Sequence, residues 1–219
     1  MSGFPKRPMI YLNRRTLEGN REGKKVPSLR PGVPSRGNAF SHLLGRASYA
    51  LTGWHFIGEL PDLPKFVLII APHTSNWDFF VGLGALFALG IKLEFFGKDS
   101  IFTWPLGPVM RWLGGIPVDR SVSQDRVAES VAEFKSRDKL ILGVAPEGTR
   151  KPVEEWKTGF YYVARGAGVP IVPVGFDYAK KAIVIGEPFT PTGEVEDDIQ
   201  KLRGFFENIK AKRPENYVR

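Results

Sequence analysis

The sequence contains no cysteine and only three histidines among its 219 residues. Without cysteine, the chain can form no disulfide bond, no thiolate zinc site and no cysteine nucleophile. His42, His55 and His73 are too scattered along the sequence to suggest a metal cluster. We therefore expect no bound metal.

Two common catalytic motifs and two kinds of apolar segment are also missing. The Gly-x-Ser-x-Gly motif of serine hydrolases and the Walker A spacing of nucleotide-binding loops are absent. No apolar run reaches the roughly 20 residues that a membrane-spanning helix needs. The first apolar residues, 9–12, are too few for the hydrophobic region of a secretory signal, so we expect no cleaved leader.

The net charge of +8 is concentrated near the N-terminus. Residues 1–38 hold nine of the 31 Lys/Arg and two of the 23 Asp/Glu, which leaves residues 39–219 almost neutral. The first segment is rich in proline and lacks apolar periodicity, so we expect a basic, disordered arm. Such an arm attracts nucleic acid or anionic lipid headgroups, or simply increases solubility.

Residues 39–219 alternate uniformly apolar runs with helical patterns. The patterns predict strands at 65–70, 92–96, 114–120, 140–144, 169–175 and 182–185, and helices at 40–54, 79–91, 103–113, 123–135 and 197–212. Strands this apolar have no solvent-facing side, which favours a sheet with helices on both faces. The chain length favours one domain. We therefore predict a single α/β domain with a largely parallel or mixed sheet.

For three of these helices, the sequence allows two environments. The amphipathic helix at 40–54 either covers the core, which we favour, or lies in a membrane interface. The helix at 79–91 is apolar all round and is predicted to be buried, although Phe79 and Phe80 could wall a hydrophobic substrate channel. The aromatic segment at 103–113 either packs inside or forms an apolar lip over lipid.

The first predicted strand ends at residues 71–78, Ala-Pro-His-Thr-Ser-Asn-Trp-Asp. Junctions between a strand and a helix hold side chains at the edge of a sheet. If Ser75 or Asn76 caps the helix, Asp78 lies in its first turn and can orient the His73 imidazole. The pair indicates a general base; the simpler alternative is a cap or a surface residue.

Other polar residues follow later strands. Arg120 ends one of them, and residues 146–150, Pro-Glu-Gly-Thr-Arg, follow another. Ligands gather beyond the carboxyl ends of strands in such sheets, and guanidinium groups hold phosphate. The pattern indicates activation of a hydroxyl group on an anionic substrate. Alternatively, Arg120 forms a structural ion pair and Glu147 caps a turn.

The sequence resembles the glycerolipid acyltransferase family, which includes the lysophosphatidic acid acyltransferases. His73 and Asp78 match the His-x4-Asp motif of that family. Residues 114–120 resemble its Gly-x-x-Phe-Ile-Asp-Arg block, residues 146–150 its Pro-Glu-Gly-Thr-Arg block, and residues 169–174 its proline-containing fourth block. The four blocks occur in the family's order over about half of the chain.

The resemblance implies an O-acyltransferase of phospholipid biosynthesis. His73 would deprotonate the acceptor hydroxyl with support from Asp78, and the alkoxide would attack an acyl thioester of coenzyme A or acyl carrier protein, without a cofactor. The acceptor, a lysophosphatidic acid, would contact Arg120, Glu147, Gly148, Thr149 and Arg150. Pro170 and Pro173 would shape the acyl or oxyanion region.

Three departures from the family pattern leave the acceptor open. Pro117 replaces a phenylalanine, Ala145 stands where phenylalanine is common, and Lys151 stands where serine is frequent. Another lysolipid, a glycolipid or an aminolipid is therefore an alternative acceptor.

A lipid acceptor and the absence of a spanning segment lead us to expect a cytoplasmic protein on the inner, anionic face of the membrane. In a different class, the chain would be a non-enzymatic binder of nucleic acid or acidic partners through its basic arm. We do not favour that alternative, because it leaves the His73–Asp78 pair unexplained.

Overall fold

The computed structural model describes residues 26–118 and 125–218 of the chain. These residues form a seven-stranded sheet. In spatial order the strands are β1 (His55–Ile57), β7 (Ala182–Ile185), β6 (Ile171–Asp177), β2 (Lys65–Ile70), β5 (Leu140–Val144), β3 (Glu94–Lys98) and β4 (Gly115–Val118). The β6–β7 pair is antiparallel and the other pairs are parallel, so the predicted mixed sheet is confirmed.

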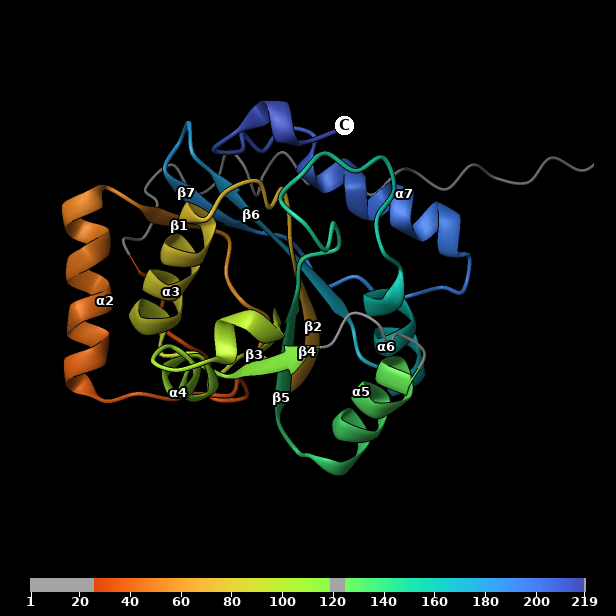
Figure 1. Cartoon of the computed structure of the whole chain (residues 1–219), viewed down its shortest axis with the longest axis horizontal. Helices are drawn as coiled ribbons and strands as arrows, with labels where there is room; N and C mark the ends of the chain where they lie inside the picture. The colour runs from red at the N-terminus through yellow and green to blue at the C-terminus, as the bar shows by residue number, and fades with distance from the viewer. Residues whose placement is uncertain (1–25, 119–124, 219) are drawn as a thin grey trace, which may run out of the picture.

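Helices cover both faces of this sheet, as predicted. One face carries α2 (Ala39–Thr52) and α3 (Trp77–Leu89), and the other carries α5 (Asp125–Ser136), α6 (Gly159–Ala167) and α7 (Val195–Phe206). Figure 1 shows the two groups to the left and right of the sheet. Shorter elements are η1 (Asp99–Phe102), α4 (Gly107–Trp112) and η2 (Pro214–Asn216).

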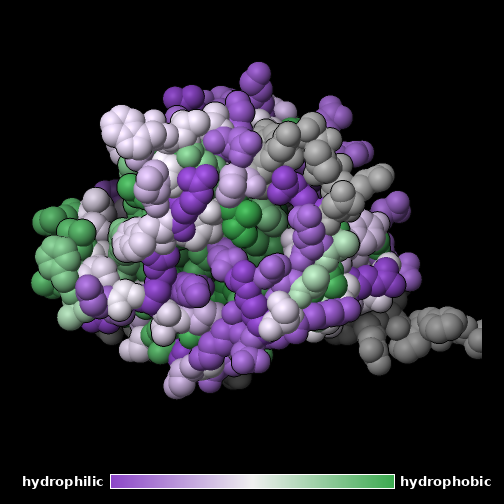
Figure 2. All heavy atoms as spheres, turned by 60° about the horizontal axis from the view of Figure 1, so that its bottom comes forward, coloured by the Kyte–Doolittle hydropathy of each residue, from purple (hydrophilic) through white to green (hydrophobic). Residues whose placement is uncertain are grey.

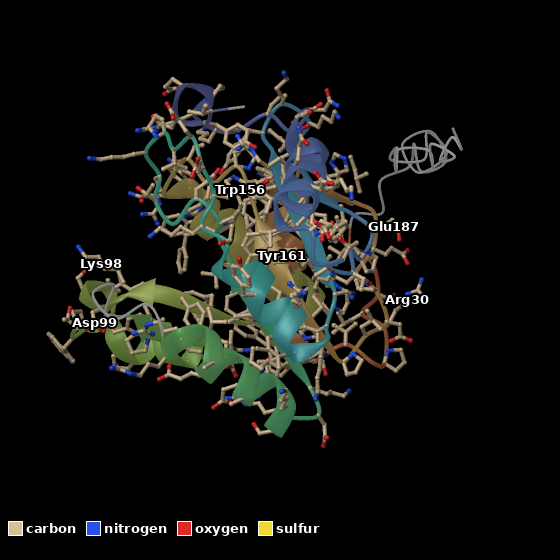
Figure 3. All side chains as sticks on the ribbon, turned by 90° about the vertical axis from the view of Figure 1, so that its right-hand side faces the viewer. Arg30, Lys98, Asp99, Trp156, Tyr161 and Glu187 are labelled. Carbon is tan, nitrogen blue, oxygen red and sulfur yellow. The ribbon has the colours of Figure 1, made fainter. Side chains whose placement is uncertain are left out.

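The central strand β2 contributes to two hydrophobic cores. Phe66 and Leu68 belong to the core below α2 and α3, whereas Val67 and Ile69 belong to the core below α5, α6 and α7. Trp156 and Tyr161, labelled in Figure 3, lie in this second core. Burial on both faces explains why β2 is continuously apolar instead of alternating.

Helix α2 packs against α3 through its small and polar side. Gly45 is buried there, and the Tyr49 hydroxyl donates a hydrogen bond of 3.1 Å to the Val81 carbonyl. A Cβ atom on Gly45 would lie 2.2 Å from the Ala88 nitrogen, so only glycine permits this approach of the two helices.

The apolar side of α2 therefore faces outward. Its large side chains are 55–88% exposed, namely Phe40, Leu43, Leu44 and Leu51. Figure 2 shows the resulting hydrophobic patch over α2, at the left of the view. Our preference for a core-covering face was wrong, because helical periodicity shows which side is apolar and not which side meets the protein.

The predictions for the next two helical segments also need correction. Helix α3 is not buried all round: Trp77 and Phe80 are exposed at its N-terminal end. The segment predicted as one helix at 103–113 consists of irregular chain followed by α4. Its Met110 and Leu113 side chains form a small core with Phe102 of η1, whereas Trp104, Leu106, Val109 and Trp112 are exposed.

The N-terminal boundary lies earlier than predicted. Residues 26–38 pack on the domain: Val33 is only 1% exposed, and Ser35 forms a β-bridge with Ile91. The arm predicted for residues 1–38 is therefore wrong for residues 26–38, while residues 1–25 lie outside the described part. Within residues 26–118 and 125–218, no helix has the length and apolarity to cross a membrane.

The Gly45 contact yields a first prediction. Gly45→Ala should lower the free energy of unfolding by about 1–3 kcal/mol, because the added methyl group meets α3 backbone that cannot move aside cheaply. Urea unfolding followed by circular dichroism measures the change.

Gly204→Ala in α7 is the matched control. A Cβ atom there meets nothing within 4 Å, so alanine should raise the free energy of unfolding by about 0.5–1 kcal/mol. Equal effects of the two substitutions would contradict the close approach of α2 and α3.

Candidate active site

The loop between β2 and α3 lies at the carboxyl edge of the sheet. In Figure 1 this loop, the loop after β5 and the C-terminal segment meet at the top of the molecule. The parallel pairing of β2 with both β5 and β6 brings their carboxyl ends to this edge. Polar residues from distant parts of the chain therefore gather around His73.

The Asp78 carboxylate, in the first turn of α3, is the centre of this cluster. Its Oδ2 atom accepts hydrogen bonds from the backbone N–H groups of Thr74, at 2.9 Å, and Ser75, at 2.8 Å. The same oxygen lies 3.3 Å from Nδ1 of His73. Asp78 is buried, so these donors compensate for the loss of hydration of its charge.

His73 is held by this carboxylate and remains accessible. When Nδ1–H faces Asp78, Nε2 is the nitrogen left to accept a proton. The side chain is 21% exposed, so a substrate can reach it. The structure thus brings His73 and Asp78 together, with one imidazole nitrogen beside the buried carboxylate and the His73 side chain partly open to solvent.

The start of α3 differs from the expected cap. Asn76 occupies the N-cap position without a side-chain hydrogen bond, whereas the Ser75 hydroxyl accepts a bond of 3.2 Å from the Trp77 N–H. Asp78 instead bonds to the residues before the helix. The carboxylate consequently shapes the loop that carries His73.

Glu147 joins the same loop from the turn after β5. Its Oε2 atom accepts a hydrogen bond of 2.7 Å from the backbone N–H of His73. Among the described residues, its Oε1 atom has no hydrogen-bond partner although it is buried. Burial, with a smaller contribution from the negative charge of Asp78, raises the pKa of Glu147 to about 7, against the opposing hydrogen bond from His73. Glu147 thus supports the His73 backbone and does not cap its own turn.

The rest of this turn is compact. Gly148 has a positive φ of 65°, which favours glycine, and its N–H donates to the Ala145 carbonyl. The Thr149 hydroxyl accepts a bond from the Lys151 N–H, and Arg150 is exposed. The other predicted phosphate ligand, Arg120, lies outside the described residues.

The two proline positions do not adjoin His73. Pro170 precedes β6 at its amino end, where its carbonyl accepts from the Val67 N–H, so it lies at the opposite edge of the sheet. Pro173 is buried within β6, paired with Ile69. A direct role of Pro170 in an acyl or oxyanion region does not fit this position, and the side chain of Pro173 is buried inside the sheet.

Sequence reasoning missed two contributions to this edge. The Tyr178 hydroxyl donates a hydrogen bond of 2.7 Å to Oδ1 of Asp78. The backbone N–H of Arg213 donates to the Thr74 hydroxyl at 3.2 Å, and the Asn216 amide donates to the Thr74 carbonyl at 3.4 Å. No local pattern signals contacts between residues 100 or more positions apart.

A model of the Acyltransferase family matches residues 59–177. This chain belongs to the acyltransferase family. The matched region contains His73, Asp78 and Glu147, and it ends one residue before Tyr178.

Individual relatives are consistent with this assignment. The 1-acyl-sn-glycerol-3-phosphate acyltransferase of Haemophilus influenzae is 25% identical over 201 residues, which cover 82% of each chain. The enzyme of the same name from Escherichia coli is 30% identical over 154 residues, 66% of this acyltransferase and 61% of the relative. The crystal structure of PlsC, a 1-acyl-sn-glycerophosphate (LPA) acyltransferase from Thermotoga maritima, matches 80% of both chains with a TM-score of 0.56 at 20% identity, which supports the fold.

The raised pKa of Glu147 yields a second prediction. A carboxyl group whose folded-state pKa exceeds its value of 4.5 in the unfolded chain stabilises the fold fully below pH 4.5 and loses this contribution as the pH rises through about 7. Glu147→Gln removes the titration. Relative to the wild type, the variant should gain on the order of 2 kcal/mol in free energy of unfolding between pH 5 and pH 8.

Urea unfolding of both proteins at several pH values measures this difference. Glu187→Gln, which changes an exposed carboxylate on the surface shown in Figure 3, is the control and should leave the pH dependence unaltered. Parallel stability curves for the wild type and Glu147→Gln would show that Glu147 ionises as readily in the folded protein as in the unfolded chain.

Proposed function

We propose that this acyltransferase moves a fatty acyl group from an acyl thioester to the free hydroxyl of a lysophosphatidic acid. The observation that carries the proposal is the 3.3 Å contact between His73 Nδ1 and the buried Asp78 carboxylate. It leaves Nε2 of an accessible imidazole as the proton acceptor. The names of the relatives from Haemophilus influenzae and Escherichia coli support the choice of acceptor.

In the proposed reaction, His73 Nε2 takes the proton of the acceptor hydroxyl as its oxygen attacks the thioester carbonyl. The negative charge of Asp78 stabilises the imidazolium that forms. The new C–O bond gives a tetrahedral intermediate, and the C–S bond then breaks. The imidazolium returns its proton to the leaving thiolate, so the products are a diacylated glycerol phosphate and the free thiol of coenzyme A or acyl carrier protein. Each step uses side chains of this chain and requires no cofactor.

We further propose that Arg150, with Arg120, binds the phosphate of the acceptor. Arg150 is exposed at the end of the turn whose Glu147 bonds the His73 backbone. A guanidinium group there could reach a phosphate while the neighbouring hydroxyl approaches the imidazole.

The third prediction concerns the base. His73→Ala should lower kcat by about 100-fold or more, because general-base catalysis contributes about 10²–10⁴ in rate. Asp78→Asn should also lower kcat, since an amide cannot stabilise the imidazolium. Purified variants are assayed with a labelled acyl-CoA and with acyl-ACP, each against a panel of lysolipids, and the products are identified by mass.

His42→Ala is the matched control. His42 lies on α2, where its Nε2 faces the Arg36 carbonyl at 3.3 Å, and its loss should leave kcat unchanged. Folded His73→Ala with normal turnover would reject the mechanism. Wild-type acylation of a lysolipid, glycolipid or aminolipid in preference to lysophosphatidic acid would reject the acceptor and retain the chemistry.

We also propose that the protein docks on the anionic inner face of the membrane, where a lipid acceptor resides. The outward leucines of α2 and the exposed Trp104 and Trp112 provide apolar side chains that an interface can bury, each worth about 1.5–3 kcal/mol when fully buried. Residues 1–25 contain seven Lys/Arg and two Asp/Glu, a charge that anionic headgroups attract. Trp77 and Phe80, exposed at the start of α3, add two apolar side chains in the helix that follows the His73 loop.

The fourth prediction tests this docking. The double variant Leu44→Ser, Leu51→Ser should reduce binding to anionic vesicles by about tenfold or more, because two outward side chains no longer enter the interface. Deletion of residues 1–25 should also reduce binding, and high salt should mimic the deletion by screening charge. Vesicle sedimentation measures both effects.

Tyr162→Ser is the control, since it removes an exposed aromatic side chain from α6 on the other face of the sheet. It should leave vesicle binding unchanged. If the double variant sediments with vesicles like the wild type, α2 is not the docking surface.

A further inference from the structure

We infer that Tyr178 is a positioning residue of the catalytic pair: its hydroxyl holds the Asp78 carboxylate in the plane that aligns His73. The inference rests on the proposed function, in which His73 is the base. It adds a residue outside the four sequence blocks and outside the matched region 59–177.

The hydrogen bonds of Asp78 are divided between its two oxygens. Oδ2 accepts hydrogen bonds from the N–H groups of Thr74 and Ser75 and lies beside His73. Oδ1 accepts a hydrogen bond of 2.7 Å from the Tyr178 hydroxyl. Rotation of the carboxylate about its Cβ–Cγ bond would carry both oxygens away from their donors, so a donor at Oδ1 in addition to those at Oδ2 restricts its plane more tightly. The Tyr178 bond therefore supplies the second point of attachment.

Tyr178 is itself held from three sides. It follows β6 directly, and its backbone N–H donates to the Lys210 carbonyl at 2.9 Å. Trp54 meets its ring edge-on, with the ring centroids 5.1 Å apart. The Lys212 ammonium lies 5.4 Å from the ring centroid on a cation–π contact. The phenol is thus fixed before any substrate binds, as a positioning residue must be.

The hydroxyl stays protonated throughout the pH range of an assay. Burial raises the pKa of Tyr178, and the hydrogen bond to Asp78 and its negative charge raise it further. Tyr178 is accordingly a constant donor and is not a second base.

Loss of this donor has a defined electrostatic effect. A hydrogen bond to Oδ1 draws part of the negative charge of Asp78 away from His73. Without it, the carboxylate stabilises the imidazolium more strongly, so the base stays protonated to a higher pH. Among the described residues, hydrogen bonds and side-chain contacts place four ionisable groups around His73: Asp78 from α3, Glu147 from the loop after β5, Tyr178 after β6 and, across the Tyr178 ring, Lys212 from the C-terminal segment.

The fifth prediction is the effect of Tyr178→Phe, which keeps the ring and removes the donor. We expect kcat to fall about tenfold with little change in KM for either substrate, because alignment is lost and binding is not. The acid limb of the pH–rate profile should move upward by about 0.5–1 pH unit. Both measurements are repeated in the Glu147→Gln background, which removes the group that titrates at about pH 7.

Tyr161→Phe provides a matched control. The Tyr161 hydroxyl donates at 2.8 Å to another buried carboxylate, Asp198, on the side of the sheet shown in Figure 3. Its loss should lower thermal stability and leave kcat and the acid limb unchanged. The same kinetic changes in both variants would mean that Tyr178 acts only through stability, which would overturn the inference.

Replacement of Tyr178 by 3-fluorotyrosine gives a second, near-isosteric test if Tyr178→Phe folds poorly. Fluorination makes the phenol a stronger donor, so the acid limb should move downward, opposite to the shift in Tyr178→Phe. An upward shift, or none, would contradict the inference.

NMR titration separates this inference from the proposed function, because it needs no turnover. The chain has three histidines, and His73→Ala identifies the resonance of His73. Tyr178→Phe should raise the titration midpoint of His73 and leave those of His42 and His55 unmoved. If the wild type transfers no acyl group, the proposed function fails, and the change in the His73 midpoint still tests the positioning role of Tyr178. If the wild type is active and neither the midpoint nor kcat changes in the variant, the inference fails alone.

Discussion

The Asp78 carboxylate is buried, and the carboxyl edge of the sheet is arranged around the groups that compensate for the loss of its hydration. Two backbone N–H groups, an imidazole and a phenol surround it. A buried charge without such donors would be costly in free energy, so each of these groups is held in contact with Asp78. The loop after β2, the start of α3 and the end of β6 are thereby fixed to one another. Glu147 adds a second buried carboxyl group that holds the same loop by its backbone.

The helices on the two faces of the sheet differ in which of their sides they bury. Helices α5, α6 and α7 bury large aromatic side chains and close one core around Trp156 and Phe206. On the other face, α2 meets α3 through glycine and a tyrosine hydroxyl and turns its leucines outward. In a globular protein, a surface helix normally turns its apolar side toward the core. The domain therefore has one face whose helices bury their apolar sides and one face on which α2 presents apolar side chains to solvent.

Much of this architecture could be predicted because it depends on local patterns. The continuous apolar run at β2 predicts a strand buried on both faces, and the spacing of His73 and Asp78 places both in one junction. Three-residue β1 is too short to give a periodic signal, and α6 carries Gly159 and Gly166, which weaken a helical pattern. Both elements exist because tertiary packing supports them.

The remaining errors have a common origin in long-range packing. Residues 26–38 look like a basic, proline-rich tail because their buried side chains, Pro27, Val33 and Pro34, do not recur with the period of a helix or strand. The outward face of α2 depends on how closely Gly45 approaches α3, which the pattern of α2 alone does not contain. Tyr178 lies 100 positions from Asp78, and only the pairing of β2 with β6 makes them neighbours.

That pairing makes the candidate active site sensitive to how the sheet assembles. Ile70 lies opposite Val174, and this register sets the position of Tyr178 beside the loop that follows β2. A slip by one residue would shift the end of β6 by about 3.3 Å and turn its side chains to the other face. Because the strands come from distant parts of the chain, their parallel pairing should form slowly during folding. A chain that collapses with the wrong register could keep its helices and its compactness but would lack the hydrogen bond that completes Asp78.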